Sequence, residues 1–149
     1  LKDPTIFNES NLRLVHSRLQ NSKITNTNFT NALEYATKGD LVYLDPPYIP
    51  LNKTSNFSKY AKEDFSVLDQ YALAGVIEGL SQRGVRVILS NSDTKLTREI
   101  FGNFLDLHKV TAFRSISAKA SSRGDVNELV GVNFKIKTKL ELVKTRLVV

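Results

Sequence analysis

Compact runs of apolar residues recur along the chain and mark its predicted strands. Residues 41–44 (LVYL), 85–89 (VRVIL) and 128–134 (ELVGVNF) are typical of buried strands. Residues 23–29 and 107–114 show a more mixed pattern that also favours strands. The run at 41–44 stops at two consecutive prolines, which cannot donate hydrogen bonds to a sheet. Five strands are therefore expected.

Between these runs, apolar residues recur at helical spacing. The spacing predicts helices over 10–21, 31–37, 66–84 and 93–104, with glycine or polar residues at their ends. Helices thus alternate with strands along most of the chain, which predicts an α/β fold with a mostly parallel sheet and helices on both faces. The last two strands have no helix between them and are expected to form an antiparallel hairpin at one edge. The stretches 50–65 and 115–125 are polar and are expected to be loops.

The strand at 41–44 leads directly into Asp45-Pro46-Pro47-Tyr48. In open α/β sheets, ligands bind beyond the carboxyl ends of strands. Asp45 and the Pro46 carbonyl could accept the two N–H groups of an exocyclic amine on a flat ring, and Tyr48 could stack on that ring. The prolines fix the backbone and supply no competing N–H. The alternative is an ordinary turn after a strand, because Asp and Pro are common turn residues.

Charge is distributed unevenly over the 149 residues, whose formal net charge is +6. Residues 107–149 contain nine Lys and Arg against three Asp and Glu, whereas residues 1–106 contain twelve of each. A basic segment beside a neutral body can attract a polyanion such as a nucleic acid. A solubilising tail would have the same composition.

The chain contains no cysteine. Its composition therefore excludes disulfides, thiolate zinc sites and a cysteine nucleophile, and we expect no metal site and a reducing compartment.

Several segments together resemble one known family. The segments LVYLDPPYIPLNKTSNFSKYAKEDF, VILSNSDTKLTREIF, RSIS and SSRGDVNELV resemble the C-terminal portion of the Dam-type DNA adenine N6-methyltransferases, which methylate adenine in GATC. The resemblance runs from about Lys23 to Phe134 and implies a Rossmann-like fold that uses S-adenosyl-L-methionine to methylate a flipped-out adenine. It also implies double-stranded DNA as a partner, a monomer, a restriction endonuclease as a candidate system partner, and a bacterial or phage protein of the cytoplasm, associated with the nucleoid.

The resemblance assigns roles to individual residues of the tetrapeptide Asp45-Pro46-Pro47-Tyr48. Asp45 and Pro46 would hold the adenine N6 and Tyr48 would stack on the base, so that the tetrapeptide as a whole is the expected catalytic motif. Asp45 would also lie close to the methionine end of the cofactor.

A second pair, Asn28-Phe29, stands where the family usually has an acidic residue followed by Phe in contact with the adenine of the cofactor. Asn28 lacks the charge of that acidic residue, so its bond to the cofactor would be weaker. The alternative is that Asn28 ends a strand and Phe29 belongs to the core.

The polar loops and the basic region supply candidates for contact with DNA. A cation, small donors and an aromatic in the first loop suit a DNA-facing lid, and arginines near the last strands suit contact with phosphate. A solvated loop and ordinary surface charge are the alternatives. The candidates are Lys53, Ser55, Asn56 and Phe57 in the first loop, and Arg114, Ser121 and Arg123 around the second.

The sequence lacks the glycine-rich cofactor loop of the family, because none of its seven glycines form a G-x-G pair. It also begins at Leu1 and contains no Met, so we expect a fragment. Residues 1–8 would be a remnant of the target-recognition region or a linker, and residues 9–149 the C-terminal part of the catalytic domain. Two hypotheses remain: a piece of an adenine methyltransferase that is inactive in isolation, and a non-catalytic DNA-binding or assembly module with a methyltransferase-like core.

Overall fold

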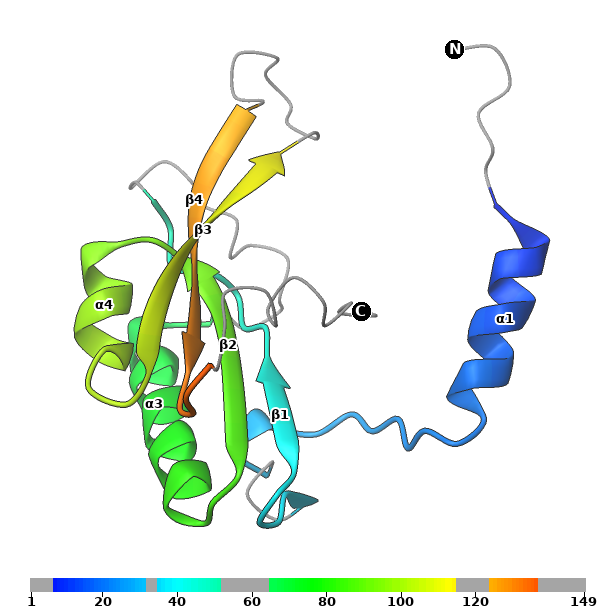
Figure 1. The fold of residues 1–149 in the computed structure, drawn as a ribbon, viewed down its shortest axis with the longest axis horizontal. Coiled ribbons are helices and arrows are strands. Elements are labelled where there is room, and N and C mark those ends of the chain that lie inside the picture. The colour runs from blue at the N-terminus through cyan, green and yellow to red at the C-terminus, as the bar shows by residue number, and fades with distance from the viewer. Residues whose placement is uncertain (1–6, 32–34, 52–64, 115–123, 137–149) are drawn as a thin grey trace.

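The structure, a computed structural model, describes residues 7–31, 35–51, 65–114 and 124–136. Figure 1 shows the described elements as an α/β body with one helix standing away from it. In chain order the elements are α1 (Glu9–Leu19), the 3-10 helix η1 (Phe29–Asn31), β1 (Leu41–Leu44), α3 (Val67–Gln82), β2 (Arg86–Ser92), α4 (Lys95–Phe101), β3 (Asp106–Arg114) and β4 (Gly124–Val132).

The four described strands form one mixed sheet in the order β1-β2-β4-β3. Strands β1 and β2 are parallel, with Leu44 opposite Leu89, and α3 connects them. Strand β4 is antiparallel to both β2 and β3. The expected antiparallel hairpin is confirmed at one edge of the sheet. The expectation of a mostly parallel sheet is wrong for the described strands, because β4 folds back between β2 and β3 and leaves one parallel pair.

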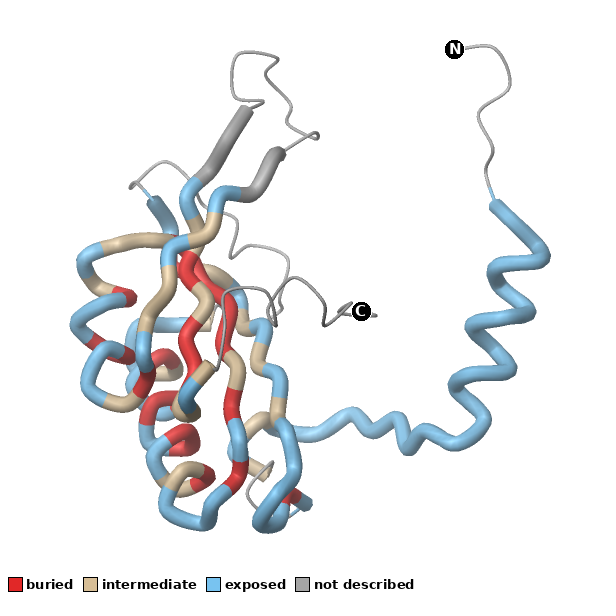
Figure 2. The backbone as a smooth tube through the Cα atoms, viewed as in Figure 1, coloured by how far each residue is buried: buried red, intermediate tan, exposed pale blue. Residues whose placement is uncertain are grey.

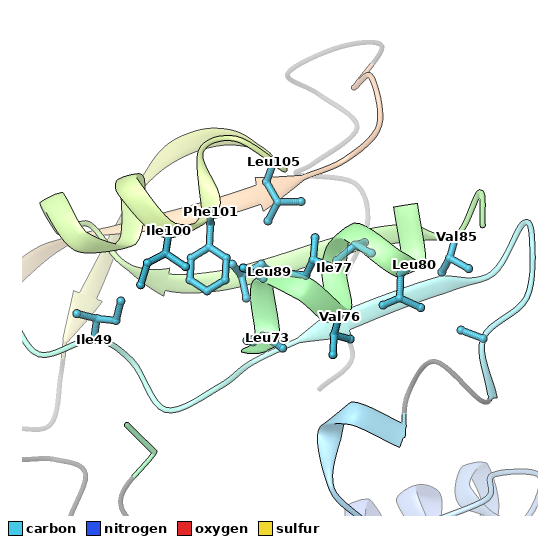
Figure 3. Packing of buried hydrophobic residues seen from close by; sticks show 13 residues of the cluster. Ile49, Leu73, Val76, Ile77, Leu80, Val85, Leu89, Ile100, Phe101 and Leu105 are labelled. Carbon is cyan, nitrogen blue, oxygen red and sulfur yellow. The ribbon is translucent and has the colours of Figure 1, made fainter. Parts of the chain in front are cut away.

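Helices α3 and α4 pack against the same face of the sheet (Figure 1). The core lies between them and β2, where Ile77, Leu80, Leu89 and Phe101 are almost completely buried. Figure 3 shows these side chains meeting between the helices and the sheet, and Figure 2 shows burial concentrated in the same layer. The expectation of helices on both faces is not met among the described elements. On the other face, Tyr43 of β1 keeps 41% of its surface exposed.

Capping residues in the local sequence determine where α3 and α4 begin and where α3 ends. Ser66 and Asp69 form a reciprocal capping box at the start of α3, with the Ser66 side chain accepting from the Asp69 amide and the Asp69 carboxylate accepting from the Ser66 amide. After α3, Gly84 adopts φ +75°, a conformation that favours glycine. Thr94 caps α4 by accepting from the Thr97 amide. These helices match the predicted ones, although α4 ends earlier than expected.

The N-terminal elements differ more from the sequence predictions. Helix α1 forms as expected, although its cap is Asn8 rather than Ser10, and all its residues are exposed. Residues 23–29 form no strand, which corrects that prediction. The physical reason is that Ile24 is the one apolar residue of 23–28 and stays exposed, so the segment has no apolar face to bury against the sheet. Of the helix predicted over 31–37, Tyr35 is helical, and residues 32–34 lie outside the described residues.

Candidate active site

Two strand ends bring the candidate site together. Because β1 and β2 are parallel, their carboxyl ends meet at the same edge of the sheet. Strand β1 continues into Asp45-Pro46-Pro47-Tyr48, and β2 ends in Ser90-Asn91-Ser92, all three of which are buried. The predicted tetrapeptide therefore lies at the edge where ligands bind in open α/β sheets.

The Asp45 carboxylate is held from one side by a chain of hydroxyl groups. The Ser90 hydroxyl donates to Asp45 Oδ1 at 2.7 Å, and the Tyr43 hydroxyl donates to Ser90 Oγ at 3.2 Å. Asp45 itself is exposed, and no described residue donates to its Oδ2. The carboxylate is thus fixed through one oxygen and keeps the other available as an acceptor.

Tyr48 is half-buried beside this carboxylate. Burial raises the pKa of the Tyr48 phenol above its ordinary value of 10.0; a hydrogen bond with Ser90 opposes burial more weakly, and the nearby Glu128 and Asp45 add smaller raising effects. The phenol is therefore neutral at physiological pH. A neutral aromatic ring next to an open carboxylate is suited to a flat, amine-bearing ligand.

Two buried amide side chains, which sequence reasoning did not identify, bind the backbone around Tyr48. Gln70 of α3 donates through Nε2 to the Pro47 carbonyl at 2.9 Å, and Asn91 of β2 accepts through Oδ1 from the Ile49 amide at 3.0 Å. The sequence contains two signals that could have pointed to them: Gln70 is a polar residue on the apolar face of a predicted helix, and Asn91 is an amide at the end of a buried strand. That both bind the backbone around Tyr48 depends on tertiary packing.

The expected cofactor pair has local partners. Asn28 Oδ1 accepts from both the amide and the hydroxyl of Thr30, each at 3.0 Å, and so caps η1. Phe29 packs against the core and against Phe65, with ring centroids 5.6 Å apart. Since both lone pairs of the Asn28 oxygen are used, the Nδ2 donor is the group left for a cofactor. Contact with the cofactor at this pair stays a prediction.

Most of the expected DNA-facing residues fall outside the described part of the chain. Arg114 is the last residue of β3, opposite Gly124 of β4, and only its backbone is described. In the described part, no cluster of three or more His, Cys, Asp or Glu could hold a metal ion, and no helix is long and apolar enough to cross a membrane. The residues outside the description are Lys53, Ser55, Asn56, Phe57, Ser121 and Arg123.

Comparison with known families identifies the family of this chain. Residues 1–116, which include β1, the tetrapeptide, α3 and β2, match the family described as D12 class N6 adenine-specific DNA methyltransferase. The chain belongs to this D12 class. The resemblance to the Dam-type enzymes is thereby confirmed.

Curated methyltransferases from several organisms are similar to most of this chain. A type II methyltransferase, M1.LlaDCHI of Lactococcus lactis subsp. cremoris, is 40% identical over 135 residues, which are 89% of this chain and 47% of the relative. The type II methyltransferase M.MjaIII of Methanocaldococcus jannaschii is 41% identical over 137 residues, 89% of this chain and 46% of the relative. The DNA adenine methylase of Escherichia coli K12 is 36% identical over 126 residues, 85% of this chain and 45% of the relative. The chain spans about half the length of the curated relatives it matches.

Proposed function

We propose that this chain provides the adenine-binding part of a DNA methyltransferase that transfers a methyl group from S-adenosyl-L-methionine to N6 of an extruded adenine in double-stranded DNA. The observation that carries the proposal is the Asp45 carboxylate, held by Ser90 at the carboxyl edge of the sheet with its second oxygen free of described donors. The family match supports adenine over other bases.

The chemistry assigned to the tetrapeptide follows from its acceptors. Asp45 accepts one N–H of the adenine amine and the Pro46 carbonyl accepts the other, which turns the nitrogen lone pair out of conjugation with the ring. Neither Pro46 nor Pro47 has an N–H that would compete for these acceptors. The neutral ring of Tyr48 stacks on the base and replaces the stacking that the base loses on leaving the duplex. Asp45 would hold the amine while its nitrogen bonds to the methyl carbon; the carbon–sulfur bond of the cofactor would break, S-adenosyl-L-homocysteine would leave, and the proton lost from the nitrogen would pass to solvent beside the exposed Asp45.

The residues present fit the cofactor in part. S-adenosyl-L-methionine, when bound, supplies the electrophilic methyl group. The exposed Asp45 would lie close to the methionine end of the cofactor, whereas the sequence contains no G-x-G loop to bind its remainder. We therefore propose that activity requires residues equivalent to the uncovered half of the relatives, and that the 149-residue chain alone transfers no methyl group.

The test uses what we call the completed enzyme, in which this chain is joined to the half of the Lactococcus lactis methyltransferase that lies outside the match. We expect it to form N6-methyladenine in duplex DNA, and propose GATC as the target. Labelled cofactor, base analysis of the product and a scrambled duplex measure this. Binding of DNA without any methyl transfer would favour the alternative of a non-catalytic module.

Replacing the carboxylate gives the decisive variant. We expect Asp45→Asn to lower the methylation rate of the completed enzyme about 10²- to 10³-fold, because the amide no longer offers a charged acceptor at this oxygen. Asp106→Asn is the matched control, since Asp106 is an exposed carboxylate at the amino end of β3, on the opposite edge of the sheet. Full activity of Asp45→Asn would contradict the assigned mechanism.

A further inference from the structure

Two amide side chains are buried where the site meets the core. Gln70 is 3% exposed and Asn91 is 1% exposed. Burying an amide in an apolar core costs free energy unless its hydrogen bonds are made. Here they are made to each other and to backbone: Asn91 Nδ2 donates to Gln70 Oε1 at 3.4 Å, and Asn91 Oδ1 also accepts from the Ser92 amide at 2.8 Å.

The remaining bonds of the pair go to the backbone of the tetrapeptide and of Ile49, the residue that follows it. Gln70 binds the Pro47 carbonyl and Asn91 binds the Ile49 amide, so the two contacts lie immediately before and after Tyr48. The backbone of this turn has few donors of its own, because Pro46 and Pro47 have no N–H. The orientation of the turn is therefore determined by side chains from α3 and β2.

We propose that Gln70 and Asn91 are positioning residues for methyl transfer, acting as an amide clamp that holds the backbone on both sides of Tyr48. The clamp fixes the height of the Tyr48 ring and the direction of the Pro46 carbonyl relative to the Asp45 carboxylate. Apolar side chains of the same size would fill this space without any desolvation cost, but they would leave the turn free to reorient. This inference rests on the proposed function and assigns to it two residues outside the tetrapeptide.

The chain offers a matched control for each member of the clamp. Asn133 is a partly buried amide that also binds backbone, accepting from the Val87 amide at 2.7 Å and donating to the Val85 carbonyl at 2.9 Å. Its contacts lie at the opposite end of β2 from the tetrapeptide. Gln82 is an exposed glutamine at the end of the helix that contains Gln70.

Amide hydrogen exchange measured by NMR on the chain itself tests the geometry. In Asn91→Ala, exchange at the Ile49 amide should be about tenfold faster while exchange at the Val87 amide is unchanged. In Asn133→Ala the effect should be reversed. Equal acceleration at both amides in both variants, or unchanged exchange at Ile49 in Asn91→Ala, would overturn the clamp. If Asn91→Ala does not fold, Gln70→Met replaces it: because Gln70 Oε1 accepts from Asn91 Nδ2, its loss should also speed exchange at the Ile49 amide, whereas Gln82→Met should leave that exchange unchanged.

Steady-state kinetics of the completed enzyme test the positioning role. We expect Gln70→Met and Asn91→Ala to lower kcat about 100-fold through misplacement of the base, with KM for DNA nearly unchanged because phosphate contacts dominate DNA affinity. Gln82→Met and Asn133→Ala should retain kcat at temperatures where they are folded. Equal loss of kcat in Asn133→Ala and Asn91→Ala at matched stability would assign the amides to folding alone and overturn the proposal. An inactive unmutated enzyme would contradict the proposed function, while hydrogen exchange would still decide whether the clamp exists.

Discussion

The hydroxyl of Ser90 gives Asp45 a defined orientation without using up its charge. A serine donor at 2.7 Å occupies one carboxylate oxygen, and the Tyr43 hydroxyl in turn orients the serine. A lysine or arginine in this position would neutralise Asp45 and compete with the adenine amine for it. The neutral donor therefore suits a carboxylate whose task is to accept a hydrogen bond from substrate.

The ring of Tyr48, rather than its hydroxyl, should carry its role. We expect Tyr48→Phe to retain most of the activity of the completed enzyme and Tyr48→Ala to lose the stacking contribution of about 1–3 kcal/mol, measured as kcat/KM for methylation. A loss in Tyr48→Phe as large as that in Tyr48→Ala would assign the role to the hydroxyl instead.

The raised pKa of Tyr48 adds a pH dependence to this prediction. Below pH 10.0 the phenol is neutral in both the folded and the unfolded chain, so it adds no pH dependence to the free energy of unfolding. Above pH 10.0 the phenol ionises first in the unfolded chain, so stability falls as pH rises toward the raised pKa of the folded state. Between pH 6 and 9, roughly, the activity profiles of the unmutated enzyme and Tyr48→Phe should have the same shape. A basic limb in this range that disappears in Tyr48→Phe would contradict the neutral phenol.

Asp45 and Tyr48 could be identified from sequence because a strand followed by this tetrapeptide is itself the signal. Gln70 and Asn91 could not, since their shared role depends on how α3 crosses β2 and brings together positions distant in the chain. Asn28 was identified as a candidate, but its local bonds to Thr30 are visible only in the structure.

At the scale of elements, close approach between β4 and the turn before β3 depends on a glycine. A Cβ added at Gly131 would lie 2.8 Å from Leu105 Cδ1 and 2.9 Å from Leu107 Cδ2. Leu105 is buried in the core, so it has little room to move away. The segment 128–134 was predicted as a strand from its apolar pattern, but the pattern does not show that one residue must lack a side chain.

Substitution of this glycine should destabilise the fold. We expect Gly131→Ala to lower the free energy of unfolding by about 1–3 kcal/mol, through displacement of the two leucines. Gly75→Ala in α3 is the control, because a Cβ there has no neighbour within 4 Å and should raise stability by about 0.5–1 kcal/mol. Denaturant unfolding measures both variants, and a Gly131→Ala protein as stable as the unmutated chain would show that β3 and β4 can separate locally.

Some strands were predicted correctly from sequence and others were not, and the difference has a physical reason. Residues 41–44 and 85–89 are apolar except for the exposed Arg86 and pair with each other, so local pattern and tertiary pairing agree. Residues 23–28 contain one apolar residue, the exposed Ile24, so they gain little from joining a sheet. The position of β4 between β2 and β3 is also a property of pairing, which periodicity does not contain.

For the whole molecule, the uncovered face of the sheet is consistent with relatives that are longer than this chain. The described helices cover one face, while Leu41 and Tyr43 on the other keep 49% and 41% of their surface exposed. The sequence predicted helices on both faces, and the relatives are about twice as long as the match. A chain that must pack further residues on its second face would show this distribution of apolar surface.

The described end of β3 lies on the same edge of the sheet as the tetrapeptide. Strand β4 is antiparallel to both β2 and β3, so β3 runs in the direction of β2, and its last residue, Arg114, lies beyond the carboxyl end of β2 (Figure 1). If adenine binds at Asp45 as proposed, a cation at Arg114 is on the side of the sheet where flanking phosphates would lie, and its contact with phosphate is a prediction.

Salt dependence of DNA binding tests this placement. We expect the combined change of Arg114→Gln and Arg123→Gln to lower the slope of log affinity against log salt by up to about 2 in the completed enzyme, one unit for each phosphate that is no longer neutralised. Lys38→Gln with Arg86→Gln is the control, because both residues lie at the amino end of β2, near Gly84, and their replacement removes the same charge. Titration of a fluorescent duplex at several salt concentrations measures both pairs. Equal slope changes in the two pairs would mean that net charge alone determines affinity, whereas a change confined to the hairpin pair would assign phosphate contact to the edge where Asp45 lies.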